Sequence, residues 1–327
     1  MNRRRALAWI AACSALSGVR ARAQQQSAPR RIGYFSAASA AANAPRLAAF
    51  RQGMSELGWV DGKDYMVDAR YGDARGGNIS QLAADVVASR PDVILTPSDE
   101  GMRAFGKATK TIPIVFATGD DPVGLGVVKS MQRPGGNMTG LVTLRNELGA
   151  KRFQLLKESF PRILHVAVLF ASGDAASVPQ VKVIEVAAAR LNVRVSPIEI
   201  KQPGDIEAAV KRGVALGCDA YVVADGFLLN TERRKVAEAV MASKRPAIFG
   251  RPEHVEAGGL MSYGAPPLEN FRRSAAYVDK ILKGANPGEL PIEQPRKFEL
   301  TINLKTAKAI GIDVPTSVLV RADKVIQ

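Results

Sequence analysis

The sequence predicts an α/β protein of two lobes, each built on a doubly wound parallel sheet. The chain has 327 residues, which is more than one hydrophobic core usually spans, so two units are expected. Short apolar runs typical of buried strands alternate with segments of 3.6-residue period typical of amphipathic helices. This alternation starts again after Gly140. Alternating strands and helices of this length favour parallel sheets with helices on both faces.

Residues 1–23 predict an export signal peptide that is separate from the fold. The signal has a basic n-region at residues 3–5, an apolar h-region at residues 6–19 and a small-x-small cleavage site at residues 21–23. It is too short to span a membrane. Arg4 and Arg5 also fit a twin-arginine signal, and Cys13 leaves lipidation open, although soluble export is the preferred interpretation. Residues 24–30 are expected to be a polar tether.

The charge and cysteine content narrow the function classes. Cleavage after Ala23 removes five arginines and no acids, which takes the formal charge from +14 to +9. The remaining basic residues are scattered and lack interleaved aromatic residues, so we expect no nucleic-acid partner. Only Cys218 remains in the mature chain, which excludes an internal disulfide.

The first half of the mature chain repeats a pattern of strand, loop and helix. Leu47, Phe50, Met54 and Leu57, for example, recur at helical spacing. Strands are expected at residues 31–36, 65–70, 92–96 and 112–116. Helices are expected at residues 45–57, 79–89, 100–109 and 123–131.

The second half repeats the same pattern of strands and helices and ends in a C-terminal segment, called the tail. Helices are expected at residues 148–159, 179–191, 205–216 and 232–243. Strands are expected at residues 165–170, 193–200, 219–223, 247–249 and 259–262. The tail predicts a helix at 269–283, a strand at 298–303 and a short helix at 306–310.

Residues 112–141, IPIVFATGDDPVGLGVVKSMQRPGGNMTGL, are the stretch around which we expect the chain to be organised. A buried strand is followed by a loop of small residues, and Pro122 suits the first turn of a helix with Asp121 as its N-cap. Loops at the carboxyl ends of parallel strands line the ligand crevice in this class of fold. The stretch therefore predicts one wall of a binding cleft and the approach to a hinge.

FATGDDPVG and RPGGNMTGL in this stretch resemble one periplasmic family of ABC transporter substrate-binding proteins, which has relatives that bind aromatic amino acids. RRIGYFS at 31–37, AFRQGMSELGWVDGKDY at 49–65, EAGGLMSYG at 256–264 and most of residues 275–315 are similar to the same family. The resemblance covers nearly the whole mature chain. It implies a type 1 periplasmic-binding fold with no chemistry of its own and no cofactor. It also implies a monomer that passes a small-molecule ligand to an inner-membrane ABC permease.

In the resembling family the chain crosses between the lobes three times. We expect these crossings near residues 140–146, 263–267 and 295–297. The N-terminal lobe would then comprise residues 31–142 plus 264–295, and the C-terminal lobe residues 143–263 plus 296–327. Three connections form a hinge on which the lobes close over a ligand.

The candidate ligand-binding residues lie mainly in loops that follow strands. Hydroxyl and backbone N–H groups at Ser36, Ala37 and Ser98 are expected to receive a carboxylate. Asp174 or Asp225 would pair with an ammonium group. Tyr263 and Phe227 would stack on an aromatic ligand or pack the hinge, and Asp121 is better explained as a helix cap. The full set is Ser36, Ala37, Ser98, Asp99, Gly119, Asp121, Asp174, Asp225, Phe227 and Tyr263.

Signatures of an enzyme are weak in this sequence. His165 begins an apolar strand, and His254 lacks the HExxH spacing of a zinc site. Neither a GxSxG elbow nor a GxxxxGK phosphate loop is present. We therefore expect a solute receptor with no catalytic residue and no metal. Three alternatives stay open: an exported α/β hydrolase-like enzyme, a receptor that feeds a membrane sensor, and a sugar-responsive repressor, which the export signal opposes.

Overall fold

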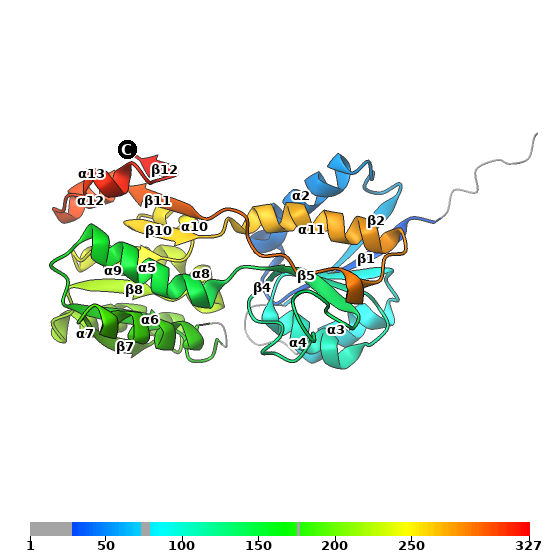
Figure 1. The fold of residues 1–327 in the computed structure, drawn as a ribbon, viewed down its shortest axis with the longest axis horizontal. Helices are drawn as coiled ribbons and strands as arrows, with labels where there is room; N and C mark the ends of the chain where they lie inside the picture. The colour runs from blue at the N-terminus through cyan, green and yellow to red at the C-terminus, as the bar shows by residue number, and fades with distance from the viewer. Residues whose placement is uncertain (1–27, 73–78, 175–176) are drawn as a thin grey trace, which may run out of the picture.

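A computed structural model describes residues 28–72, 79–174 and 177–327 of the chain. The predicted signal peptide, Cys13 and the first part of the predicted tether lie outside these ranges. The described residues form two α/β lobes that lie side by side along the long axis of the molecule (Figure 1). The predicted class of two doubly wound lobes joined by a hinge is confirmed. The exact residues at which one lobe gives way to the other stay a prediction.

The first lobe contains a parallel sheet of order β2-β1-β3-β4-β5. Register pairs Ile32 of β1 with Val67 of β2 on one side and with Val93 of β3 on the other. The strands are β1 (Arg30–Ser36), β2 (Tyr65–Tyr71), β3 (Val93–Thr96), β4 (Ile114–Gly119) and β5 (Met138–Val142).

Strand residues of the first sheet alternate between two apolar layers. Tyr34 and Leu95 belong to the core under α2 (Ala40–Glu56) and α11 (Pro267–Leu282). Their neighbours Phe35 and Ile94 face the opposite core, under α3 (Ile79–Ala88) and α4 (Asp99–Ala108). This period of two explains the uninterrupted apolar runs in the sequence, because strands such as β3 and β4 are buried on both faces, whereas the edge strand β2 is partly exposed.

The second lobe contains a sheet of order β7-β6-β8-β9-β10-β11-β12. Its paired strands are parallel except β10 and β11, which run antiparallel. The strands are β6 (His165–Phe170), β7 (Arg194–Glu199), β8 (Ala220–Val223), β9 (Ala247–Phe249), β10 (Met261–Gly264), β11 (Glu299–Asn303) and β12 (Lys324–Ile326).

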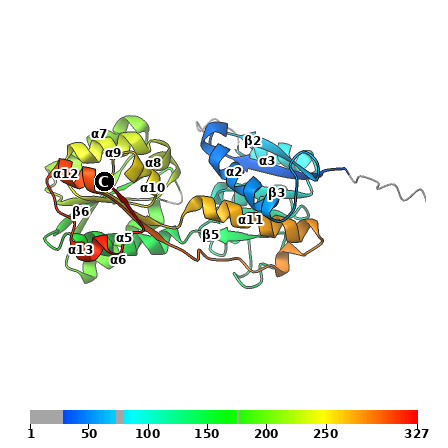
Figure 2. The ribbon, with the colours of Figure 1, turned by 90° about the horizontal axis from the view of Figure 1, so that it is seen from above.

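Helices cover both faces of the second sheet (Figures 1 and 2). One apolar core lies under α5 (Arg145–Ser159), α6 (Val178–Arg190) and α12 (Leu304–Ile310). The other lies under α7 (Ile206–Ala215) and α9 (Arg233–Ala242). The shorter helical segments are η1 (Pro203–Asp205), α8 (Phe227–Thr231), α10 (Pro252–Glu256), η2 (Pro287–Glu289) and α13 (Thr316–Leu319).

Three segments connect the lobes, between β5 and α5, between β10 and α11, and between η2 and β11. They are tied to one another beside β5. The Val142 N–H donates to the Glu293 carbonyl at 3.0 Å, and the Glu293 N–H donates to the Gly140 carbonyl at 3.1 Å. Asn270 of α11 donates through Nδ2 to the Val142 carbonyl at 3.2 Å. The hinge is therefore one hydrogen-bonded bundle rather than three independent linkers.

The predicted helix at residues 123–131 is wrong. The chain forms turns there, in which Asp121 Oδ1 accepts from the Gly124 N–H at 2.7 Å. Gly126 has φ of +68°, which ends the first turn, and glycine is a poor helix former. The last strand of the parallel run also lies later than expected, at Met261–Gly264 rather than 259–262. The short elements α8, α10, α13 and β12 were not predicted.

Gly53 offers a test of the contact between α2 and α11. A Cβ atom at this position would lie 2.2 Å from the Arg272 carbonyl oxygen and 2.8 Å from the Ala275 Cβ atom. We expect Gly53→Ala to lower the free energy of unfolding by about 1–3 kcal/mol, because the helices must separate. Gly149→Ala in α5 is the control, because its nearest neighbour would lie at an ordinary 3.6 Å. Urea denaturation that places both variants at the same midpoint would contradict this packing.

Candidate functional site

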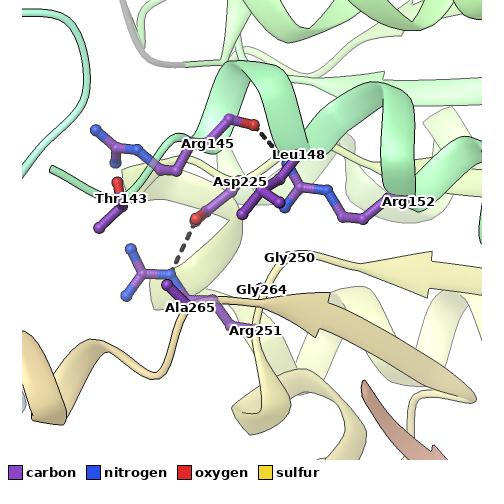
Figure 3. A pocket seen from close by; sticks show the side chains of 9 residues that line it. All are labelled: Thr143, Arg145, Leu148, Arg152, Asp225, Gly250, Arg251, Gly264 and Ala265. Carbon is purple, nitrogen blue, oxygen red and sulfur yellow. Dashed lines mark hydrogen bonds and ion pairs between the residues drawn. The ribbon is translucent and has the colours of Figure 1, made fainter. Parts of the chain in front are cut away.

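The topology of both sheets places the candidate crevice at the carboxyl ends of the strands. Each lobe contains the order 2-1-3-4-5 if its strands are numbered within the lobe. In such sheets the crevice opens beyond the carboxyl ends of the strands, where the winding reverses. These switch points lie between β1 and β3 in the first lobe and between β6 and β8 in the second. A small cavity at the hinge is lined by residues that follow β5, β8, β9 and β10, namely Thr143, Arg145, Leu148, Arg152, Asp225, Gly250, Arg251, Gly264 and Ala265 (Figure 3).

The predicted residues of the first lobe lie at this edge of its sheet. Ser36 ends β1, and its Oγ accepts from the Ala38 N–H at 3.2 Å, while Ala37 beside it is half-buried. Ser98 is the N-cap of α4 and accepts from the Gly101 N–H at 3.3 Å. Gly119 ends β4 and is buried against Phe116. Asp121 is exposed, and the contact in the structure is the turn described above.

Arg145 joins the two lobes through an ion-pair network. It is the first residue of α5, and its Nη2 donates to Asp99 Oδ2 at 3.0 Å. Its backbone N–H donates to Asp120 Oδ1 at 2.6 Å, and its Nε lies 3.8 Å from the same oxygen. Asp99 also accepts from the Asp120 N–H at 3.0 Å through Oδ1. The preceding residue, Leu144, has a left-handed backbone with φ of +56°, which turns the chain sharply into this network.

Burial and charge act in opposite directions on this network. Burial raises the pKa values of the Asp99 and Asp120 carboxyls, and the charge of Arg145 opposes that rise. Burial lowers the pKa of Arg145, but the carboxylates of Asp99 and Asp120 raise it by more, so Arg145 stays a cation. The charge of Arg145 therefore offsets part of the effect that burial has on both acids.

A second network holds Asp225 at the carboxyl end of β8. Asp225 Oδ1 accepts from Arg251 Nε at 2.9 Å and from Asn230 Nδ2 at 2.6 Å. Gln180 of α6 fixes the Asp225 backbone, since its Nε2 donates to the Asp225 carbonyl at 2.7 Å and its Oε1 accepts from the Asp225 N–H at 2.9 Å. The carboxylate points toward Arg251 (Figure 3). Asp225 is therefore bound internally on both its side chain and its backbone.

Arg152 is a buried cation behind Asp225. Its side chain is 1% exposed, and Nη2 donates to the Arg145 carbonyl at 2.8 Å and to Gln180 Oε1 at 2.9 Å. Burial lowers the pKa of Arg152 to about 10, against the opposing charge of Asp225. Burial would raise the pKa of Asp225, but the charges of Arg251, Arg145 and Arg152 lower it well below its usual range. The carboxyl therefore stays ionised at neutral pH.

The remaining predicted residues of the second lobe have contacts within that lobe. Asp174 Oδ2 accepts from the Phe227 N–H, so an acid from the loop after β6 caps the start of α8. Phe227 itself is 37% exposed. Tyr263 packs on Phe298, with ring centroids 6.1 Å apart, where two crossings lie side by side.

Both histidines have structural contacts. Arg194 Nη2 lies 2.7 Å from His165 Nδ1, and Ser196 Oγ lies 2.8 Å from His165 Nε2, at the amino end of β6. His254 stacks on Phe249 with centroids 4.9 Å apart, and burial lowers its pKa to about 4, so its ring is neutral. In the ranges that the structure describes, no three His, Cys, Asp or Glu side chains are grouped as a metal site would require.

The comparisons with known proteins agree with this arrangement. Residues 39–326 match the family described as ABC transporter substrate binding protein. The chain belongs to this family. It is 24% identical over 263 residues to the tyrosine-binding protein of Clostridioides difficile (strain R20291). The aligned region covers 80% of this chain and 75% of that protein.

Two solved structures show the same fold as this family member. A conserved domain protein from Vibrio cholerae is 26% identical, with a TM-score of 0.84, and the match covers 90% of this chain and 99% of that chain. The ABC domain of Streptococcus pneumoniae in complex with L-Trp is 24% identical, with a TM-score of 0.83, over 91% of this chain and 100% of that chain. The fold is thus that of a type 1 periplasmic binding protein. None of the helices in the described ranges combines the length and apolarity needed to cross a lipid bilayer.

Sequence reasoning missed several charged residues of this substrate-binding protein. Arg145 and Arg152 were not candidates, although they form much of the two networks. A signal was present for them, because Arg145 lies in the first expected crossing and Arg152 follows two helical turns later, so both point to the same side. Asp120 and Arg251 lie in loops that follow strands, the kind of loop expected to line the crevice, but neither was singled out.

Arg145→Gln tests the network between the lobes. The variant leaves the buried Asp99 and Asp120 carboxylates without their cation, so we expect a loss of about 3–5 kcal/mol at pH 7. Removing the cation raises the folded-state pKa values of both acids further. An acid whose pKa is higher in the folded state than in the unfolded state destabilises the fold while it is ionised, and this cost disappears as the acid becomes protonated. The loss of stability in Arg145→Gln should therefore shrink as the pH falls toward about 4.5.

The measurement is urea denaturation from pH 7 to pH 4.5. Arg30→Gln is the matched control, because the Arg30–Asp92 pair at 3.2 Å is largely exposed and such pairs contribute about 0–1 kcal/mol. A loss for Arg145→Gln that is small, or equal at both ends of the pH range, would contradict the assigned role.

Proposed function

We propose that this protein is the periplasmic solute receptor of an ABC importer. It captures an amino acid or a related small solute between its lobes and passes it to an inner-membrane permease. The observation that carries this proposal is the concentration of charged side chains from both lobes at the carboxyl ends of their sheets, beside a hinge of three segments. It acts as an exported monomer with residues 1–23 as its signal, and it has no catalytic residue and no nucleic-acid partner.

Ligand binding and lobe closure are coupled in this proposal. A solute in the crevice touches both lobes only when they are shut, so binding favours the shut state. The Arg145 network sits at the hinge itself, where rotation moves atoms least. The loop at Ser36 and Ala37 lies outside this network and closes over the ligand, whereas Ser98 adjoins Asp99 and belongs to the hinge end of the crevice. Backbone N–H and hydroxyl groups in these loops supply part of the recognition.

The relatives support an amino acid as the ligand class. The name of the Clostridioides difficile protein states that it binds tyrosine, and the Streptococcus pneumoniae structure holds L-Trp. The identity of the solute for this chain rests on its own crevice residues, among which Phe227 and Tyr263 are candidates for contact with a ring. Asp99, Asp174 and Asp225 act on the ligand indirectly in this proposal, because they bind groups of the protein itself.

A thermal-shift screen of the mature chain, from residue 24, tests the proposed function. The panel contains the common amino acids, small organic acids, amines and neutral sugars. A specific ligand at 100 times its dissociation constant should stabilise the folded state by about 2.7 kcal/mol. Small-angle scattering of the same sample should show a smaller radius of gyration, because the lobes close.

Two results would contradict the receptor. One is a panel without a stabilising solute, and the other is a hit that mass spectrometry shows to be chemically converted. The second result would favour the exported enzyme. Retention of the unchanged hit after gel filtration supports the receptor.

A further inference from the structure

The geometry points to an anion-binding position in the crevice, formed by Arg46 of the first lobe and Arg251 of the second. The ligand of this receptor is accordingly a solute with a carboxylate or another organic anionic group, which both guanidinium groups bind when the lobes are shut. This inference rests on the proposed function and deepens it. It adds two cationic side chains to the hydroxyl and backbone N–H groups at Ser36, Ala37 and Ser98 that are proposed to receive a carboxylate.

Arg46 is held in place by its own lobe. It lies on α2, which begins just after the carboxyl end of β1. Its Nη1 donates to Asn43 Oδ1 at 3.2 Å, and its Cζ lies 5.9 Å from the centroid of the Phe271 ring. Asn43 is itself buried and accepts from the Tyr34 hydroxyl at 2.7 Å. The guanidinium is thus positioned before any ligand arrives.

The position of Phe271 places Arg46 near the hinge. Phe271 lies in the first turns of α11, which follows the crossing at Gly264 and Ala265. Gly264 and Ala265 line the same cavity as Arg251. The pKa of Arg46 is lowered by burial and, next, by the charge of Arg251 in the other lobe. Arg46 thus lies on the first-lobe side of the crossing whose residues Gly264 and Ala265 line the cavity beside Arg251.

Arg46 lacks a neutralising partner among the residues that the structure describes. Within the described ranges, it forms no ion pair with an acid, although it is only partly exposed. A partly buried charge is costly unless it is paired, and a second cation nearby adds to the cost. Closing the lobes around an empty crevice would bring the two cations closer together. An anion between them removes the repulsion and adds charge-assisted hydrogen bonds.

Arg251 has two terminal nitrogens that can donate hydrogen bonds to such an anion. Its Nε is bound to Asp225, but neither of its terminal nitrogens has a hydrogen-bond partner among the described residues. Figure 3 shows both terminal nitrogens directed away from Asp225. The planar fork of an arginine matches a carboxylate in two parallel hydrogen bonds. Asp225 thus orients Arg251 and leaves its outer edge for the ligand.

Nearby acids offset only part of this charge, because Asp225 and Glu253 raise the pKa of Arg46 but burial and the charge of Arg251 lower it by more. Asp225 already accepts from Arg251 and Asn230. Glu253 affects the pKa of Arg46, yet it forms no ion pair within the described ranges, and its Oε2 is buried without a hydrogen-bond partner. A donor on the ligand, such as an ammonium or hydroxyl group beside the carboxylate, would satisfy that oxygen. Within the described ranges, Glu253 therefore adds one buried acceptor without a partner to the charges around Arg46 and Arg251.

Calorimetric titration of the mature chain with matched probes tests this inference. The probes are L-tyrosine, tyramine, which lacks the carboxylate, and 3-(4-hydroxyphenyl)propanoate, which lacks the ammonium group. The same three forms of any other hit from the thermal-shift screen are added. We expect the amine to lose binding and the acid to retain the larger part of it. Arg46→Gln should weaken binding of the carboxylate-bearing probe by about 10- to 100-fold, and Arg46→Lys by less.

Arg51→Gln is the matched control, because Arg51 lies on the same helix and pairs with exposed Asp61 at 2.7 Å. It should leave the dissociation constant unchanged. Arg46→Gln breaks no ion pair within the described ranges and removes one hydrogen bond to Asn43, so it is expected to fold, and circular dichroism checks this. Arg251→Gln is a second variant, which should weaken the same probe.

The outcomes separate this inference from the proposed function. If amines or neutral solutes bind as tightly as acids, or if Arg46→Gln binds like the parent chain, the anion position is wrong and the receptor stands. If no solute binds and the lobes never close, the receptor is wrong and the inference falls with it. Loss of acid binding in Arg46→Gln with normal binding in Arg51→Gln supports both.

Discussion

The ion pairs of Arg145 with Asp99 and Asp120 are the interaction on which the rest of the structure depends. They link a residue that opens the second lobe to two acids at the edge of the first sheet, 3.0 and 3.8 Å away. Buried ion pairs contribute little net stability compared with apolar packing, but they are demanding in geometry. The network therefore specifies how the lobes meet. It fixes the hinge end of the crevice and leaves the outer loops free to move.

The same physical rule accounts for the second network. Burial would protonate Asp225 if it stood alone, and the surrounding arginines keep it ionised. Gly250 makes this packing possible, because a Cβ atom there would lie 2.3 Å from Arg152 Nη1 and 2.8 Å from the Asp225 Cβ atom. In both networks the acids are satisfied internally. The charge that is left over at the crevice is cationic, and this surplus is the basis for the inferred ligand chemistry.

Most of the fold, but only part of the candidate site, could be predicted from the amino-acid sequence. The apolar run of β6 and the helical spacing in α2 could be recognised in the sequence, because burial on one or both faces makes apolar residues recur at regular intervals. The prediction of a helix at residues 123–131 was wrong. Pro122 suits the first turn of a helix, but Gly124 and Gly126 favour turns. Ser36, Ser98 and Asp225 were placed at strand ends, where the crevice lies. Their partners were not predictable, because Arg145 meets Asp99 across 46 residues and Arg251 meets Asp225 across 26.

The amino-acid sequence by itself determined that this chain forms two α/β lobes with a hinge between them, and that the loops after the strands form the crevice. Local periodicity carries that information, because each strand and helix must bury its own apolar face. Only the tertiary structure decided which charges are paired inside the protein and which lie together at the cavity beside the hinge. A charge acts over a few ångströms in space, and the residues within that distance come from different strands, helices and lobes.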